Sequence, residues 1–210
     1  MTSKQEEQYA RQADDWTERA YADVAAYLRH RAELIVSLGR QLVQGDEVLD
    51  LACGDAGLGE ALLARRLRYY GVDSTPEMVE AARRRLGGDA SVALADLNDF
   101  VPPRPVAATT VFRAIYYARD RRAFFGRVLG YTEKKLVFDL NPRQYRVDDV
   151  LAELRSVGFA SVQLRPFFVP QTVLLPGPVL AAATALERTG PLARLALRVH
   201  FTYVVAASRI

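Results

Sequence analysis

Short apolar runs alternate with segments of helical hydrophobic spacing along most of the chain. The apolar runs predict strands near residues 47–52, 68–73, 91–95, 106–112, 135–140, 160–168 and 199–207. Helical patterns fall between them, and this alternation is typical of a parallel sheet covered by helices. We therefore predict an α/β fold of the Rossmann-like, doubly wound class, with a mostly parallel seven-stranded sheet and helices on both faces.

Amphipathic helices are expected before the first strand. In the segment YADVAAYLRHRAELIVSLGRQL, apolar side chains recur at helical spacing at Val24, Tyr27, Leu28, Ile35 and Leu38. The first 45 residues therefore predict one or two helices that precede the sheet.

Composition restricts the class of protein. The length of 210 residues and the 50% hydrophobic content fit one domain with a sizeable core. One cysteine excludes an intramolecular disulfide and suits a reducing cytoplasm, and the polar opening MTSKQEEQYARQADDW lacks the apolar core of a signal peptide. The segment 170–186 is interrupted by prolines and a glycine and is shorter than the about 18–20 apolar residues that span a bilayer. We expect a cytoplasmic protein without a membrane span.

The charge pattern gives little support for a nucleic-acid partner. The isoelectric point is about 9.1, but the net charge is only +3. The densest basic cluster, Arg83 to Arg85, follows Glu77 and Glu80 in a helical segment. This pattern favours a solvated helix face over a phosphate-binding patch.

A glycine-rich turn follows the first predicted strand in the stretch VLDLACGDAGLGEALL, residues 48–63. Ligands of such sheets bind beyond the carboxyl ends of the strands. Glycines permit a tight turn and a close approach of backbone amides, and a helix start near Leu58 directs free N–H groups at a ligand. With Asp50, Cys53 and Gly54 beside it, the turn predicts a cradle for a nucleotide-sized molecule.

Two further acids follow the next two predicted strands. Asp73 is placed to accept hydrogen bonds from both hydroxyls of a ribose. Ser74 and Glu77 predict a capping box, and Pro76 suits the first helical position. Asp96, in the stretch LADLNDF, can accept from an exocyclic amine. The acids and the glycine turn together fit an adenosine.

Over roughly residues 45–165, the sequence resembles class I S-adenosylmethionine-dependent methyltransferases that modify small molecules. The stretch LDLACGDAG is similar to the family's glycine-rich first motif, which holds the methionine portion of the donor. Asp73 matches the ribose-binding acid, and Asp96 with Leu97 match the adenine-binding pair.

The chain departs from the family at two positions where glycine is frequent, Ala52 and Ala56. Alanine fits a strand end at position 52. At position 56 it would disturb the loop unless Gly57 absorbs the turn.

The resemblance implies that the cofactor is S-adenosyl-L-methionine. It implies methyl transfer to an oxygen or nitrogen nucleophile of a small-molecule acceptor by in-line displacement, with catalysis mainly by positioning. We assign no catalytic residue and expect no metal site, because His30 and His200 lie outside the strand-end motifs and suit packing. Aromatic residues of the N-terminal segment resemble those that the family lays over the donor as a lid. The expected donor contacts are Asp50, Ala52, Cys53, Gly54, Asp73, Ser74, Met78, Asp96, Leu97, Arg113, Tyr9, Trp16 and Tyr21.

The acceptor is expected over the ends of the fourth and fifth strands, at Tyr116, Tyr117, Asn141 and Arg143. Ordinary loop chemistry explains these residues equally well. The apolar insertion 170–197 fits a wall for a hydrophobic acceptor, a homodimer contact or a cap on the sheet. We thus expect one domain, with a lid (1–45), a donor-binding core (46–169) and a substrate-side part with the last strand (170–210).

Two alternatives stay open. Ala52, Gly54 and Gly57 have the spacing of a dinucleotide fingerprint with one glycine changed, which would suit an NAD-dependent dehydrogenase. The stretch YTEKK, residues 131–135, resembles a dehydrogenase Tyr-x-x-x-Lys motif, but it runs into a strand, so its Tyr and Lys would not share a helical face. The second alternative is a protein that binds S-adenosylmethionine without turnover, as a sensor or assembly partner.

Overall fold

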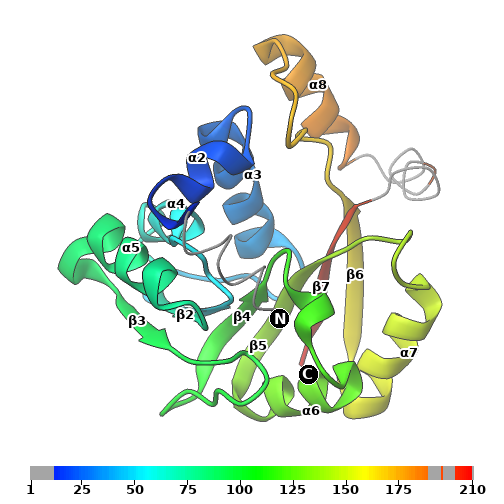
Figure 1. The fold of residues 1–210 in the computed structure, drawn as a ribbon. Helices are drawn as coiled ribbons and strands as arrows, with labels where there is room; N and C mark the ends of the chain where they lie inside the picture. The colour runs from blue at the N-terminus through cyan, green and yellow to red at the C-terminus, as the bar shows by residue number, and fades with distance from the viewer. Residues whose placement is uncertain (1–11, 189–194, 196–201, 210) are drawn as a thin grey trace.

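The computed structural model describes residues 12–188, 195 and 202–209. These residues form one sheet in the order β3-β2-β1-β4-β5-β7-β6 (Figure 1). The strands are β1 (Glu47–Leu51), β2 (Arg68–Asp73), β3 (Ser91–Leu94), β4 (Val106–Val111), β5 (Thr132–Leu140), β6 (Ser161–Pro166) and β7 (Tyr203–Ser208). The pairs from β3 to β5 are parallel, and β7 runs antiparallel to both β5 and β6. The predicted mostly parallel seven-stranded sheet is confirmed.

Helices cover both faces of the sheet (Figure 1). The first face carries α3 (Val24–Ser37), α4 (Gly57–Leu63) and α5 (Pro76–Leu86), and the second carries α6 (Arg121–Tyr131) and α7 (Val147–Val157). Successive side chains of a strand point to opposite faces. Val48 accordingly joins the core under α3 and α4, and Leu49 joins the core under α6 and α7. The doubly wound arrangement follows from these continuous apolar strands.

The N-terminal segment consists of two parts that lie in different places. A short turn η1 (Ala13–Asp15) and α2 (Trp16–Ala20) precede α3. Helix α3 packs on the sheet with Tyr27, Ala32 and Ile35 buried, so it belongs to the cover of the core. In the described part of the predicted lid, η1 and α2 therefore come before the helix that covers the core. The domain boundaries at residues 45 and 169 stay a prediction.

The junction between α6 and β5 separates Tyr131 from Lys135. Helix α6 ends at Tyr131 and β5 begins at Thr132, so the two side chains do not share a helical face, as predicted. The Lys135 ammonium group is buried and donates to the carbonyl oxygens of Val36 at 3.1 Å and Leu38 at 2.7 Å. Burial lowers the pKa of Lys135 to about 7.

Helix α8 (Gly177–Leu186) extends away from the sheet and has no buried residue (Figure 1). Its C-terminal end is tied to α3, because Glu187 Oε2 lies 2.6 Å from His30 Nε2 and Glu187 Oε1 accepts from the Phe168 N–H at 2.5 Å. His30 is thus a buried packing residue, and His200 lies outside the described residues. Within the described ranges, every helix is too short or too polar to cross a membrane.

Candidate functional site

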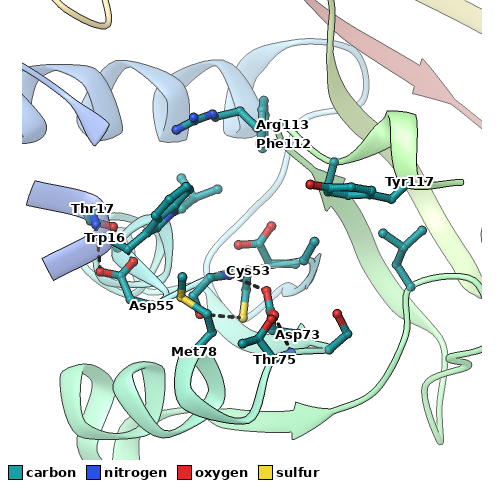
Figure 2. Close-up of a pocket in the computed structure, with 18 of the residues that line it drawn as sticks. Trp16, Thr17, Cys53, Asp55, Asp73, Thr75, Met78, Phe112, Arg113 and Tyr117 are labelled. Atoms are coloured by element: carbon teal, nitrogen blue, oxygen red, sulfur yellow. Dashed lines mark hydrogen bonds between the residues drawn. The ribbon is translucent and has the colours of Figure 1, made fainter. Parts of the chain in front are cut away.

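A pocket opens at the carboxyl ends of β1 to β4 (Figure 2). It encloses about 290 Å³, close to the lower limit of roughly 300–1,000 Å³ for small-molecule sites. The structure brings to it every predicted donor residue that it describes: Asp50, Ala52, Cys53, Gly54, Asp73, Ser74, Met78, Asp96, Leu97, Arg113, Trp16 and Tyr21. Tyr9 lies outside the described residues. Residues distant in sequence therefore converge on one cavity.

The glycine-rich turn contains two alanines in the left-handed backbone region. Ala52 has φ 57° and Ala56 has φ 59°, next to Gly54 at φ 58°. Gly57 does not absorb the turn, because Ala56 itself takes the left-handed conformation before α4. Gly57 is instead fixed by close packing, since a Cβ there would lie 2.4 Å from Thr17 Oγ1. A left-handed alanine costs roughly 1–2 kcal/mol, so the turn is strained.

Asp73 is held by two backbone amides at the end of β2. Its Oδ2 accepts from the Gly54 N–H and its Oδ1 accepts from the Thr75 N–H, both at 2.9 Å (Figure 2). Burial raises the pKa of Asp73. The predicted first helical position of Pro76 is confirmed, but the capping box is wrong, because Thr75 is the N-cap and makes no side-chain cap bond. The Asp73 carboxylate accepts the hydrogen bond of the Thr75 N–H at this junction between β2 and α5.

Asp50 is buried beneath the glycine turn. Its carboxylate accepts from Thr110 Oγ1 at 2.6 Å and from the Tyr69 hydroxyl at 2.8 Å. Burial raises the pKa of Asp50 to about 6, against the effect of these hydrogen bonds. Burial also raises the pKa of the neighbouring Cys53 thiol, so this cysteine stays protonated and is a poor nucleophile.

Asp96 marks the far end of the pocket beyond β3. Its Oδ1 accepts from the backbone and side-chain nitrogens of Asn98 at 2.7 and 2.8 Å, and Arg119 Nη2 lies 3.0 Å from Oδ2. Partial burial would raise the pKa of Asp96, but the Asn98 hydrogen bonds and the Arg119 charge outweigh it and lower the pKa. The sequence analysis did not identify Asn98 or Arg119 as pocket residues.

Helix α2 is fastened onto the glycine turn by Asp55. The carboxylate accepts from the Thr17 N–H at 3.0 Å and from Thr17 Oγ1 at 2.5 Å. Arg85 pairs with the same carboxylate at 2.8 Å and its side chain is only 18% exposed, so the predicted solvated helix face is wrong for this arginine. A Cβ on Gly54 would lie 3.2 Å from Trp16 Cδ1, so the indole covers the turn. The roles of Thr17 and Asp55 were missed.

The opposite side of the pocket carries Phe112 and Arg113, which follow β4 (Figure 2). Arg113 has φ 56°, and its N–H donates to Asp139 Oδ1 at 2.7 Å. Arg31 of α3 also lines the pocket, and this residue is only 3% exposed. The sequence did carry a signal for Arg31, since it interrupts the apolar face formed by Tyr27, Leu28 and Ile35.

The four predicted acceptor residues do not come together. Tyr117 lines the pocket (Figure 2), whereas Tyr116 is 44% exposed and its ring centroid lies 4.3 Å from that of Tyr117. Asn141 Oδ1 accepts from the Arg143 N–H at 2.9 Å within a turn after β5, and neither residue lines the pocket. The loop chemistry that was the alternative explains Asn141.

Comparison with known proteins agrees with this geometry. Residues 48–134 match the family model described as a methyltransferase domain. An uncharacterized methyltransferase of Schizosaccharomyces pombe is 37% identical over 79 residues, which are 38% of this chain and 30% of that protein. The aligned segment thus spans about 30% of the length of the curated relative.

Solved structures share the fold at low sequence identity. A TehB-like S-adenosylmethionine-dependent methyltransferase of Corynebacterium glutamicum superimposes with a TM-score of 0.65 at 15% identity, covering 99% of this chain and 100% of that one. An S-adenosylmethionine-dependent methyltransferase of Clostridium acetobutylicum gives a TM-score of 0.65 at 14% identity, covering 97% and 99%. These similarities establish the architecture.

Proposed function

We propose that the pocket binds S-adenosylmethionine and serves methyl transfer to a small-molecule acceptor, because residues 48–134 match the methyltransferase-domain model and the fold is shared with S-adenosylmethionine-dependent methyltransferases. The acceptor atom is an oxygen or nitrogen nucleophile. The observation that carries the proposal is the Asp73 carboxylate, fixed by the Gly54 and Thr75 amides at the wall of the pocket.

The chemistry of the pocket residues fits the adenosine part of the donor. Each Asp73 oxygen accepts one backbone N–H and keeps a further lone pair, so the carboxylate can also accept from ribose hydroxyls. Asp96 and Leu97 would hold the adenine, with Asp96 as an acceptor for its amine. Asp96 is held in its charged form by Asn98 and Arg119, and this supports that role.

S-adenosylmethionine supplies, when bound, a methyl group that is already electrophilic. The protein's residues then have to position the acceptor and exclude water, and positioning is worth roughly 7–11 kcal/mol. Trp16 and Phe112 provide apolar cover at two sides of the pocket (Figure 2). No general base is assigned, because His30 is paired with Glu187 away from the pocket and the Cys53 thiol is protonated.

Labelled methyl donor, incubated with the purified chain and a panel of amine, phenol and carboxylate acceptors, tests the proposal. Native mass spectrometry of the same preparation would identify a co-purified adenosyl ligand. We expect label transfer to at least one acceptor class. Donor binding without transfer to any acceptor would favour the sensor alternative, and binding of NAD with no adenosyl ligand would overturn the proposal.

A further inference from the structure

Two guanidinium groups gather at the side of the pocket away from Asp73. Arg31 comes from α3, and Arg113 follows β4 (Figure 2 shows Arg113 and Phe112 across the pocket from Asp73 and Thr75). Both residues line the cavity, so a molecule inside it can meet both charges.

Arg31 is buried, and its guanidinium donates hydrogen bonds to two neutral phenols. Its Nη2 donates to the Tyr27 hydroxyl at 2.7 Å, and its Nη1 donates to the Tyr21 hydroxyl at 3.4 Å. The guanidinium carbon lies 4.2 Å from the centroid of the Phe112 ring. Among the described residues, Arg31 Nε has no hydrogen-bond partner. Burial would lower the pKa of Arg31, but the phenols and the Asp139 charge raise it, so the group keeps its proton.

Arg113 is held over the pocket by its backbone. Its N–H donates to Asp139 Oδ1, so the nearby carboxylate fixes the left-handed main chain. The guanidinium carbon lies 5.4 Å from the Trp16 ring centroid and 6.0 Å from that of Tyr21. Its Nη1 is buried and has no hydrogen-bond partner in the part of the chain that the structure describes.

The buried Asp139 carboxylate acts electrostatically on both guanidiniums, since the charges of Arg31 and Arg113 each work to lower its pKa against burial. Among the side chains that the structure describes, no carboxylate oxygen lies within 4.0 Å of a guanidinium nitrogen of Arg31 or Arg113, so neither group forms a direct ion pair. Two buried cations beside one carboxylate leave positive charge in excess, which is costly. Aromatic faces offset part of this cost by cation–π attraction. An oxyanion placed between the two groups would remove most of it.

The methyl donor does not bring enough negative charge for this role. S-adenosylmethionine carries a sulfonium and an ammonium against one carboxylate, so it enters the pocket with a net positive charge. The pocket carboxylates Asp50, Asp73 and Asp96 lie within or just beyond the carboxyl ends of β1, β2 and β3. The donor's one carboxylate is offset by its own positive charges, so the donor adds no net negative charge beside the two guanidiniums.

We propose that the methyl acceptor carries an oxyanionic group, a carboxylate or a phosphate, which Arg31 and Arg113 bind. This inference rests on the proposed function and names its substrate class. Guanidinium groups bind such oxyanions with paired, charge-assisted hydrogen bonds. Phe112, Tyr21 and Trp16 surround the two groups, so the acceptor has a flat, apolar body attached to its anion.

The test uses calorimetric titration of the full chain with 4-hydroxybenzoate, with phenyl phosphate and with the neutral analogue 4-hydroxybenzamide. Each titration is done with and without saturating S-adenosylhomocysteine. We expect one of the anions to bind at least about tenfold more tightly than the amide, since one hydrogen bond between charged groups is worth that much. Arg113→Gln should abolish this preference, and Arg31→Lys should reduce it in protein whose thermal melt stays cooperative.

Arg119→Gln is the matched control, because Arg119 lines the same pocket but is paired with Asp96 and Asp99 at 3.0 and 3.3 Å. It should keep the preference for the anion. Equal binding of anions and amide by the wild type, or a preference that survives Arg113→Gln, would overturn the inference.

A third arm separates the acceptor from the donor's own carboxylate. If Arg113→Gln weakens S-adenosylhomocysteine about tenfold and leaves 5′-methylthioadenosine unchanged, the guanidiniums bind the donor, and the inference is wrong. If the wild type binds no adenosyl ligand, the proposed function fails by itself. The anion titrations of the free protein still decide the inference in that case.

Discussion

The two sides of the pocket are built in different ways. At the side of β1, β2 and β3, the polar groups come from strand-to-helix turns, and backbone amides hold Asp73 and Asp96 in place. At the side of β4, Arg31 and Arg113 come from separate elements and are held largely by aromatic side chains. The first side is a rigid cradle of carboxylates, and the second is an aromatic wall with two arginines beside one buried carboxylate, Asp139. A pocket divided in this way suits two different molecules.

The contact between Asp55 and Thr17 connects these two sides, because Trp16 touches Gly54 at one and Arg113 at the other. Asp55→Ala removes the two hydrogen bonds from Thr17 and the pair with Arg85, and a hydrogen bond to a charged group is worth roughly 1.5–3 kcal/mol. We expect a loss of about 3 kcal/mol in unfolding free energy by urea titration, with weaker binding at both sides. Trp16 is the one tryptophan in the chain, so its emission reports the release of α2 directly.

Thr17→Val is the matched variant for this contact, since it removes the hydroxyl and keeps the backbone bond. We expect Thr17→Val to lower the unfolding free energy about half as much as Asp55→Ala does. Unchanged tryptophan emission and stability in Asp55→Ala would show that α2 is held by other contacts.

Lys135 offers a comparison with Arg31, because both are buried cations and only Arg31 lines the pocket. The pKa of Lys135 in the folded protein is lowered to about 7 from an ordinary value of 10.5. Between these values the unfolded chain binds more protons, so the unfolding free energy should rise with pH. From pH 7 to 9 we expect a gain of up to about 2 kcal/mol, measured by urea titration.

Lys135→Met should flatten this pH dependence, and Lys134→Met, at the half-buried neighbour that pairs with Asp46, should preserve it. A wild-type protein whose stability stays constant over this range would contradict the lowered pKa.

A substitution at Ala56 tests whether the glycine-rich turn at the donor side of the pocket is strained. Ala56→Gly relieves a left-handed alanine, which costs roughly 1–2 kcal/mol, against the larger backbone entropy of glycine in the unfolded chain. We expect a net stabilisation of about 0.5–1 kcal/mol, seen as a rise of roughly 1–4 °C in the melting temperature. Ala52→Gly should behave in the same way. Gly57→Ala is the contrasting variant and should destabilise, because its Cβ would collide with Thr17. A lower melting temperature in Ala56→Gly would mean that the turn is not strained.

Sequence reasoning brought the acids of the donor side into one pocket because they lie at strand ends that align, and their binding of a donor stays a prediction. Asp50, Asp73 and Asp96 each occupy a strand end, so the topology alone brings them together. On the second side it predicted Trp16, Tyr21 and Arg113 as donor contacts but missed Arg31, because contacts there depend on the packing of separate elements. Arg31 was visible only as a charged residue on an apolar helix face, and the sequence does not say which ring it meets. Asn141 was misleading for the opposite reason, since a polar residue after a strand also serves a local turn.

The most direct test of the divided pocket is the dissociation constant of S-adenosylhomocysteine, measured by calorimetry for the wild type, Asp73→Asn and Arg113→Gln. Asparagine keeps the size of Asp73 and loses its charge, so we expect at least about a tenfold weaker affinity. Arg113→Gln should stay within about threefold of the wild type, because its partner is the acceptor. Equal losses in both variants, or an Asp73→Asn protein that binds as tightly as the wild type, would contradict the account.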